Sequence, residues 1–299
     1  MVEQLQYLPV RAAMAALGSL PRRQARRLGM AIGYAFYHLH PRLRRVGRIN
    51  LELAFPALPE EEREHILKGV YRGLGRQMAE FCLFPRLGRK QLPEVMDIVG
   101  LDHYLAALAK GRGVIFLTGH FGAWELSSFG MSLAGYPVSF IVRPLDNQPL
   151  DALVGRIRGL HGNTAIAKHE FARGLLQAMQ ANRTVGILMD QNSAPPQGVF
   201  VPFFGTPACA ATGPARIALK TGAAVIPAWA LWEEEQQKYV LYMEPALELA
   251  QSGDEKQDVA TATAQFAAVL EDWVRKYPDQ WLWVHRRWKT RPAGEAPLY

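Results

Sequence analysis

The stretch of sequence that decides the fold reads GRGVIFLTGHFGAWE and occupies residues 111–125. Residues 114–117 form a short, unbroken apolar run between glycines, which is the pattern of a strand buried on both faces. The strand is expected to end at Thr118, so that His120 and then Glu125 follow its carboxyl end. Open α/β sheets place their sites at that edge. The stretch therefore predicts both a buried parallel strand and the position of a site.

His120 and Glu125 are five residues apart, a separation that would turn them about 140° away from each other on a continuous helix. They can meet only if the chain bends between them, and Gly122 can supply the bend. We expect His120 in a loop and Glu125 in the first turn of a helix, where the helix dipole favours a carboxylate. A histidine held by a carboxylate through one ring nitrogen is a general base at the other. The H-x4-E spacing alone is not specific, and its place at a strand end supports it.

Length and composition are those of a globular protein. The 299 residues suffice for one large α/β domain or two smaller ones with an ample core. With 49% apolar and 20% charged residues, the chain is not of the disordered class. Cys82 and Cys209 offer neither metal-ligand spacing nor a disulfide framework, so we expect two buried thiols in a reducing compartment.

The positive charge is concentrated at the N-terminus. Residues 1–50 contain nine arginines and a single acid, Glu3. Apolar residues alternate with these arginines, and the uncharged stretch 28–40 is too short for a bilayer, which needs about 20 residues. We therefore expect interfacial helices that bind an anionic surface, either a membrane or a nucleic acid. Helices that simply cap the core are the alternative. No secretory signal and no clean stop-transfer segment is recognisable.

The rest of the chain predicts a mostly parallel central sheet covered by helices. Residues 60–83 have helical periodicity, and Glu80 is an interior acid expected to pair with an N-terminal arginine. We expect an N-terminal helical, membrane-proximal region over residues 1–95 and an α/β domain over residues 96–299, together one compact unit. Strands are expected over 114–118, 138–142, 164–167, 185–189, 225–231 and 239–243, and helices over 123–133, 150–159, 170–181, 213–221 and 259–276.

Polar residues follow two further expected strands. Arg143 comes after strand 138–142, where a guanidinium can bind a phosphate or carboxylate of a substrate; a surface salt bridge is the alternative. Asp190 and Gln191 follow the next buried strand at the same edge. Motifs for a phosphate-binding glycine loop, a serine hydrolase or a zinc site are absent from the sequence. We therefore expect no metal, and His120 with Glu125 is the main catalytic candidate.

Two aromatic segments lie outside these strand ends. Residues 198–208 are rich in proline and phenylalanine, and the phenylalanines are expected to line an apolar acyl channel, to face a membrane or to belong to the core. Residues 281–289, WLWVHRRWK, suit a membrane interface, stacking on nucleic acid, or a closing core strand with a basic edge. The phenylalanines concerned are Phe200, Phe203 and Phe204, and the cations of the tail are Arg286, Arg287 and Lys289.

Six motifs are spread over nearly the whole chain: RINLELAFP at residues 48–56, HFGAWE at 120–125, RPLDN at 143–147, MDQ at 189–191, FVPFFG at 200–205 and WVHRRWKTRP at 283–292. Together, and in this order, they resemble the bacterial lipid A late acyltransferases, the lauroyl and myristoyl transferases of the glycerolipid acyltransferase superfamily. The combination is far more specific than H-x4-E alone.

The resemblance implies an enzyme that moves a fatty acyl chain from a thioester to a hydroxyl of a lipid A precursor at the cytoplasmic face of the inner membrane. The co-substrate would be acyl carrier protein or a coenzyme A thioester, with no other cofactor. His120 would be the base and Glu125 its orienting acid, without an acyl-enzyme and with backbone amides near Gly122 stabilising the oxyanion. Substrate-binding roles would fall to Arg143, Asn147, Asp190 and Gln191.

The N-terminus departs from the family pattern. Members usually begin with a membrane-spanning helix, whereas residues 1–50 contain only broken amphipathic runs, which favours peripheral or monotopic attachment. Related enzymes acylate other glycolipids, such as phosphatidylinositol mannosides, or aminolipids. The second hypothesis is therefore an acyltransferase whose acceptor is another glycolipid or a lysophospholipid. The third hypothesis is a non-catalytic basic protein that binds membrane or nucleic acid. If the protein is an acyltransferase, we expect no nucleic-acid partner.

Overall fold

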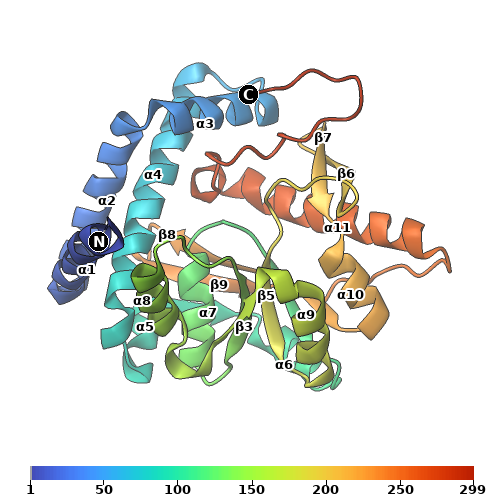
Figure 1. Ribbon diagram of the computed structural model, residues 1–299, viewed down its shortest axis with the longest axis horizontal. Helices are drawn as coiled ribbons and strands as arrows, with labels where there is room; N and C mark the ends of the chain where they lie inside the picture. The colour runs from blue at the N-terminus through green and yellow to red at the C-terminus, as the bar shows by residue number, and fades with distance from the viewer. Residues whose placement is uncertain (1) are drawn as a thin grey trace.

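Seven strands form the central sheet of the protein (Figure 1). The structure, a computed structural model, describes residues 2–299, and the strands have the order β1-β9-β8-β2-β5-β3-β4. Every neighbouring pair is parallel except β8 and β9, which form an antiparallel hairpin. The strands are β1 (Met96–Val99), β2 (Val114–Thr118), β3 (Val138–Val142), β4 (Thr164–Ala167), β5 (Thr184–Leu188), β8 (Ala224–Glu233) and β9 (Lys238–Met243).

Helices cover both faces of this sheet, as the sequence predicts. Successive side chains of β2 point to opposite faces, so Phe116 packs in the core beneath α5–α8, and Ile115 and Leu117 pack in the core beneath α9–α11. The covering helices are α5 (Leu92–Val95), α6 (Leu101–Leu108), α7 (Trp124–Leu133), α8 (Gln148–Arg158), α9 (Phe171–Gln180), α10 (Gly213–Thr221) and α11 (Glu255–Lys276), with short 3-10 helices at Phe84–Arg86, Arg89–Gln91, Leu160–Gly162, Lys168–Glu170 and Pro278–Gln280.

The aromatic segment after β5 is an antiparallel hairpin and not a loop. It consists of β6 (Gly198–Phe203) and β7 (Thr206–Ala211), and it packs against α11. Proline-rich runs predict turns, and here the prolines lie on a two-stranded ribbon where missing amide donors are tolerated. The sequence also left β1 and α6 unpredicted, because a four-residue, half-exposed edge strand and an eight-residue helix carry little periodicity.

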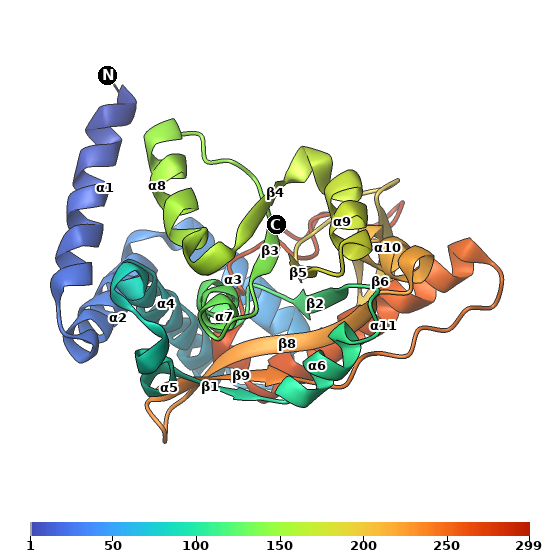
Figure 2. The same cartoon turned by 90° about the horizontal axis from the view of Figure 1, so that it is seen from below.

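Four helices form the N-terminal layer: α1 (Val2–Ser19), α2 (Arg22–Leu39), α3 (Pro41–Ala54) and α4 (Glu60–Leu83). Helix α2 lies along α4, and α1 lies beside α8 (Figure 2). Glu80, fully buried on α4, forms ion pairs with Arg22 and Arg26 of α2, which confirms the pairing predicted for this acid. An uncompensated charge at this depth would be costly, so the pair ties the two helices together.

The outer surface of the N-terminal layer carries exposed apolar side chains. Leu5 and Leu39 are 68% and 70% exposed, and Leu8, Leu28 and Phe36 are also exposed. Within residues 2–299, no helix combines the length and the hydropathy that crossing a bilayer requires. The apolar runs noted in the N-terminal sequence lie on two separate helices, α1 and α2.

Close backbone contact between α2 and α4 depends on glycine at position 75. A Cβ atom built on Gly75 would lie 2.0 Å from the carbonyl oxygen of Gly29, whereas one on Gly73 of the same helix would meet nothing within 4 Å. We expect Gly75→Ala to lower the free energy of unfolding by about 1–3 kcal/mol, since the helices must move apart. The matched control, Gly73→Ala, should raise it by up to about 1 kcal/mol. Urea denaturation of both variants measures this, and equal stability of the two would contradict the packing described.

Candidate active site

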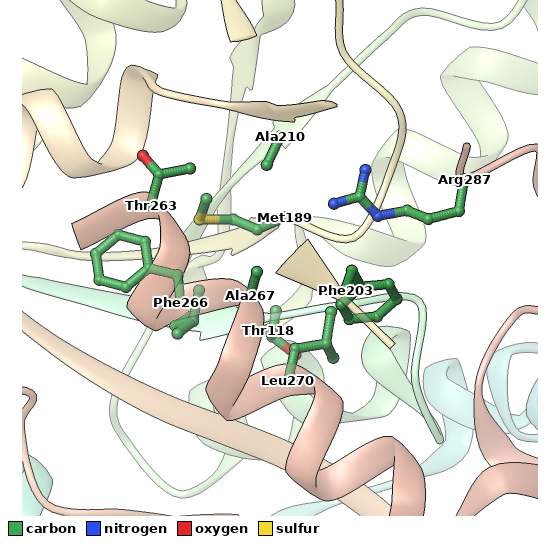
Figure 3. Close-up of a pocket in the computed structure, with 10 residues that line it drawn as sticks. Thr118, Met189, Phe203, Ala210, Thr263, Phe266, Ala267, Leu270 and Arg287 are labelled. Atoms are coloured by element: carbon green, nitrogen blue, oxygen red, sulfur yellow. The ribbon is translucent and has the colours of Figure 1, made fainter. Parts of the chain in front are cut away.

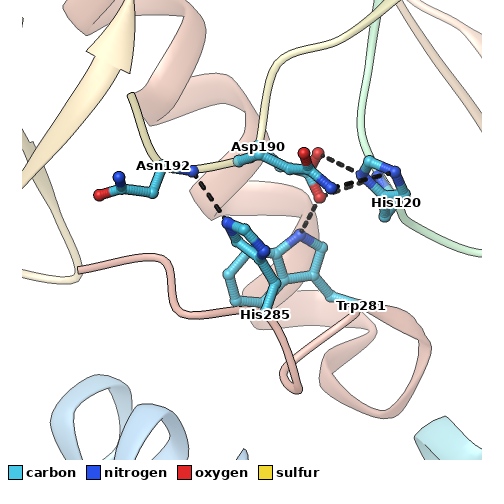
Figure 4. Close-up of polar contacts among 6 residues, drawn as sticks. His120, Asp190, Asn192, Trp281 and His285 are labelled. Carbon is cyan, nitrogen blue, oxygen red and sulfur yellow. Dashed lines mark hydrogen bonds and ion pairs between the residues drawn. The ribbon is translucent and has the colours of Figure 1, made fainter. Parts of the chain in front are cut away.

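A histidine–aspartate pair lies at the carboxyl edge of the sheet. Strands β2 and β5 pair in register with Thr118 opposite Leu188, so the residues two positions beyond each strand, His120 and Asp190, come side by side. The Nδ1 atom of His120 lies 2.9 Å from Oδ1 of Asp190, and the backbone N–H of His120 donates to Oδ2 at 2.8 Å (Figure 4). The carboxylate therefore holds both the ring and the backbone of the histidine.

The segment after α11 completes the site. Trp281 donates from Nε1 to Oδ2 of Asp190 at 2.9 Å, and the carbonyl of His120 accepts from the backbone N–H of Leu282 at 3.0 Å. His285 accepts a hydrogen bond through Nε2 from the backbone N–H of Asn192, also at 3.0 Å. Figure 4 shows His120 and Trp281 hydrogen-bonded to Asp190, and His285 hydrogen-bonded to Asn192 two residues further along the chain. The tail thus holds the loop that carries Asp190.

The two partners of the pair stabilise each other's charged forms. Burial alone would lower the pKa of His120, but the charge and hydrogen bond of Asp190 outweigh it and raise that pKa above its usual value. Burial alone would raise the pKa of Asp190, which is 3% exposed, but the charge of His120 and the three hydrogen bonds that the carboxylate accepts hold it below its usual value. With Nδ1 bound to an ionised carboxylate, Nε2 is the basic nitrogen.

The bend expected between His120 and Glu125 is present. Gly122 has φ +59°, a conformation that favours glycine, and Glu125 lies in the first turn of α7. The carboxylate of Glu125 does not orient His120, however, because it forms a two-pronged ion pair with Arg158 at the end of α8, with a distance of 2.9 Å between Oε2 and Nε. The sequence thus predicts the bend correctly, and the structure replaces Glu125 by Asp190 as the partner of His120.

The expected substrate-binding residues are scattered. Arg143 is 77% exposed and pairs with Asp146, with 3.7 Å between their charged atoms, which matches the alternative of a surface salt bridge. Asn147 caps α8 by accepting from the N–H of Leu150, and its side-chain amide reaches Gln6 of α1. Asp190 and Gln191 do lie beside the base: Asp190 is hydrogen-bonded to it, and the Nε2 atom of Gln191 lies 3.4 Å from Nε2 of His120.

The aromatic hairpin and the tail belong largely to the protein core. Phe203 and Phe204 are buried at 0% and 6% exposure, and Phe200 is half-buried. Phe203 lines a cavity of about 10 Å³ beside Arg287 (Figure 3), too small for an acyl chain. The expectation that Phe203 and Phe204 face a membrane or an acyl channel is wrong, because they pack against the three tryptophans of the tail, which are equally buried: Trp281, Trp283 and Trp288.

The buried cation of the tail is also structural. Arg287 donates to the carbonyl of Cys209 at 2.8 Å and stacks on Phe203, and burial lowers its pKa to about 10. It is therefore not available to a membrane surface. Backbone amides near Gly122 are likewise occupied: the N–H of Gly122 donates to the carbonyl of Gln280, and that of Ala123 to the carbonyl of Ala230. The expected oxyanion site at these amides is not present.

Trp124 lines two cavities, and His120 lines the larger of them. The larger, of about 510 Å³, lies between α4, the β8–β9 hairpin and the tail, and it is lined by polar and aromatic side chains. The smaller, of about 90 Å³, lies on the sheet face under α7. Most of its lining is apolar, with Phe116, Val138, Phe140, Gly186, Leu188 and Ala228, and the Glu125–Arg158 ion pair also lines it. Among residues 2–299, His, Cys, Asp and Glu side chains do not gather in groups of three that could hold a metal ion.

Sequence reasoning missed Trp281 and Arg158 as parts of this site. Arg158 had a weak signal, since a basic residue closes the helix expected over residues 150–159. Trp281 had none, because a contact between residues 91 positions apart in the chain leaves no trace in local spacing. Asp190 was placed at the correct edge, but with a substrate-binding role.

Comparison with known proteins identifies the family. The profile of the bacterial lipid A biosynthesis acyltransferases matches residues 3–290. The chain belongs to this family. It is 31% identical to the lipid A biosynthesis palmitoleoyltransferase of Escherichia coli over 91% of this chain and 87% of the relative. The lauroyltransferase of the same organism is 28% identical, over 94% and 90% of the two chains, and the myristoyltransferase 23%, over 96% and 88%.

This membership confirms the resemblance drawn from the six motifs and makes the protein an acyltransferase. The hypothesis of a non-catalytic basic binding protein is therefore wrong. Because the relatives match over most of their own length, the whole chain and not one segment of it corresponds to the family.

The pH dependence of activity should differ between variants of Asp190 and Glu125, because Asp190 is hydrogen-bonded to His120 and Glu125 to Arg158. Asp190→Asn removes the charge that raises the pKa of His120, so the acidic limb of the kcat/KM profile should move to lower pH and the maximal rate should fall about 10²-fold or more. Glu125→Gln, whose carboxylate acts on His120 only at longer range, should move that limb less. Initial rates of both variants between pH 5 and 9 measure the shift. A larger shift in Glu125→Gln would overturn the assignment of Asp190 as the partner.

Proposed function

We propose that the protein transfers a fatty acyl chain from a thioester to a hydroxyl of a lipid A precursor, with His120 as general base and Asp190 as the group that orients it. The observation that carries this proposal is the position of His120, whose Nδ1 is bound to Asp190 and whose ring lines the 510 Å³ cavity. A base at a cavity wall with a fixed tautomer is what deprotonation of a bound hydroxyl requires.

The chemistry balances through one proton. Nε2 of His120 takes the proton of the acceptor hydroxyl as the oxygen attacks the carbonyl carbon of the thioester. The tetrahedral intermediate then expels the thiolate, the C–S bond breaks, and the imidazolium returns the proton to sulfur. Asp190 stabilises the transient positive charge of the ring across 2.9 Å.

A covalent acyl-enzyme is not part of the proposal. Cys82 and Cys209 are both buried, and burial raises the pKa of each thiol, to about 11 for Cys82. Ser127, near the base on α7, donates its hydroxyl to the carbonyl of Trp124. The side-chain amide of Gln191 is the donor beside Nε2, and we assign it to the substrate oxygen at the reacting centre.

The two cavities suit the two substrates. The smaller, apolar cavity on the sheet face would take the proximal part of the acyl chain, and the larger, polar cavity would take the acceptor head group. Trp124 lines both, and its ring lies edge-on to His120 with 5.1 Å between centroids. A thioester carbonyl beside this ring would lie within reach of both the base and the acceptor hydroxyl.

The donor and the membrane complete the proposal. Acyl carrier protein is the expected donor, because an acidic carrier suits a strongly basic chain, and coenzyme A thioesters are the alternative. We assign the enzyme to the cytoplasmic face of the inner membrane, with the exposed apolar and arginine side chains of α1 and α2 against the lipid. A different glycolipid or lysophospholipid acceptor remains the second hypothesis.

Mass spectrometry of lipid A tests the proposed function. Cells that lack the gene should lose one acyl chain from lipid A, the wild-type gene should restore it, and His120→Ala should fail to do so, with a rate at least about 10²-fold lower in vitro. His169→Ala, an exposed histidine on the surface before α9, is the matched control and should restore the chain. An unchanged lipid A pattern in the deletion strain, or full restoration by His120→Ala, would refute the proposal.

A further inference from the structure

We propose that the 510 Å³ cavity binds a phosphorylated sugar head group and that Arg76 and Arg72 of α4 take its phosphate. This inference rests on the proposed function, since it specifies the acceptor of that same site. His120 lines the same cavity, so a hydroxyl of the bound sugar can reach the base while the phosphate lies against α4.

Arg76 is a cation that the described residues hold without an ion pair. Among the described residues it has no ion pair, and its hydrogen-bond partners are neutral: Sδ of Met30 at 3.5 Å and the hydroxyl of Tyr239. Its guanidinium stacks on the ring of Trp232, with 4.0 Å between Cζ and the ring centroid. Burial lowers its pKa. A half-buried guanidinium with a fixed plane and no carboxylate is suited to an anionic ligand.

Neighbouring arginines make this exception clear. Arg26 also stacks on Trp232, at 4.8 Å, but its charge is compensated by Glu80. Arg22 shares the same carboxylate. The arginines that hold α2 against α4 are thus paired with Glu80. Arg76, which lines the cavity, has no ion pair among the described residues, and Glu234 and Asp279 act on it only at longer range.

Arg72 supplies a second cation one helical turn before Arg76 on the same wall of the cavity. It stacks on Tyr34, with 5.3 Å between Cζ and the ring centroid, and it too has no ion pair among the described residues. Gly73 lines the same wall, and a Cβ there would meet nothing within 4 Å, whereas a Cβ on Gly69 would lie 2.7 Å from the Cβ of Asp279. The missing side chain of Gly73 therefore leaves space against the helix.

The acids that line the cavity have partners of their own. Glu233 accepts hydrogen bonds from the hydroxyls of Tyr242 and Tyr277, and Glu234 accepts from Nε1 of Trp232 at 2.6 Å. Burial raises the pKa of Asp279, which favours its neutral form. Among the described residues, these acids form no ion pair with Arg72 or Arg76, although Glu234 and Asp279 act on Arg76 at longer range. Carboxyl groups suit the hydroxyls of a sugar, and aromatic rings suit its faces. The cavity thus offers cations on one wall and sugar-binding groups on the other.

Steady-state kinetics with two acceptors test the inference. The first acceptor is a lipid A precursor that carries phosphate, and the second is the same lipid after phosphatase treatment. We expect the wild-type KM to be about tenfold or more lower for the phosphorylated acceptor. Arg76→Gln should raise the KM for that acceptor to the value for the other, with kcat changed little. Arg72→Gln should also raise the KM for the phosphorylated acceptor. Because Arg72 is exposed, this variant tests the proposal even if Arg76→Gln does not fold.

Arg63→Gln is the matched control, because it removes one positive charge from the same helix outside the cavity. It should leave the ratio of the two KM values unchanged. Equal KM values of the wild type for the two acceptors would overturn the phosphate site and leave the proposed function intact. An increase in KM in Arg76→Gln and Arg72→Gln that is the same for the two acceptors would do so as well. Transfer by the wild type to neither acceptor would overturn the proposed function itself.

Discussion

The site depends on one buried carboxylate that accepts three hydrogen bonds. Asp190 binds the backbone and ring of His120 and the indole of Trp281, and so it joins the ends of β2 and β5 to the tail after α11. A buried carboxylate is tolerated only when its oxygens are satisfied. The tryptophans of the tail, packed against the β6–β7 hairpin, exclude water from it. The fold around the site is thus built to keep Asp190 ionised and in place.

Much of the fold was predictable because buried strands and amphipathic helices leave periodic signals. The strand at residues 114–118 and the helix at 60–83 have the predicted bounds, and the predicted pairing of Glu80 with N-terminal arginines is confirmed. The β6–β7 hairpin was not predictable, since its prolines and phenylalanines have the composition of a loop and acquire their roles only from contacts with α11 and the tail.

The sequence predicted the position of the site more accurately than the residue that pairs with His120. Strand ends brought His120 and Asp190 to one edge, and the bend at Gly122 followed from helix geometry. Local spacing favoured Glu125 as the partner of His120. The register between β2 and β5 instead brings Asp190 into contact with the histidine. The place of Arg72 and Arg76 in the cavity wall was not predictable either, since a helix pattern does not reveal which of its cations line a cavity or form an ion pair.

The tautomer of His120 tests the central claim most directly. Nitrogen NMR of the histidine-labelled protein, with His120→Gln used to assign the signal, distinguishes a protonated Nδ1 from a protonated Nε2 in the neutral ring. The hydrogen bond to Asp190 predicts that neutral His120 carries its proton on Nδ1, with Nε2 unprotonated and free to act as the base. A neutral ring protonated on Nε2 would contradict the account, because that nitrogen could not accept the proton of an acceptor hydroxyl.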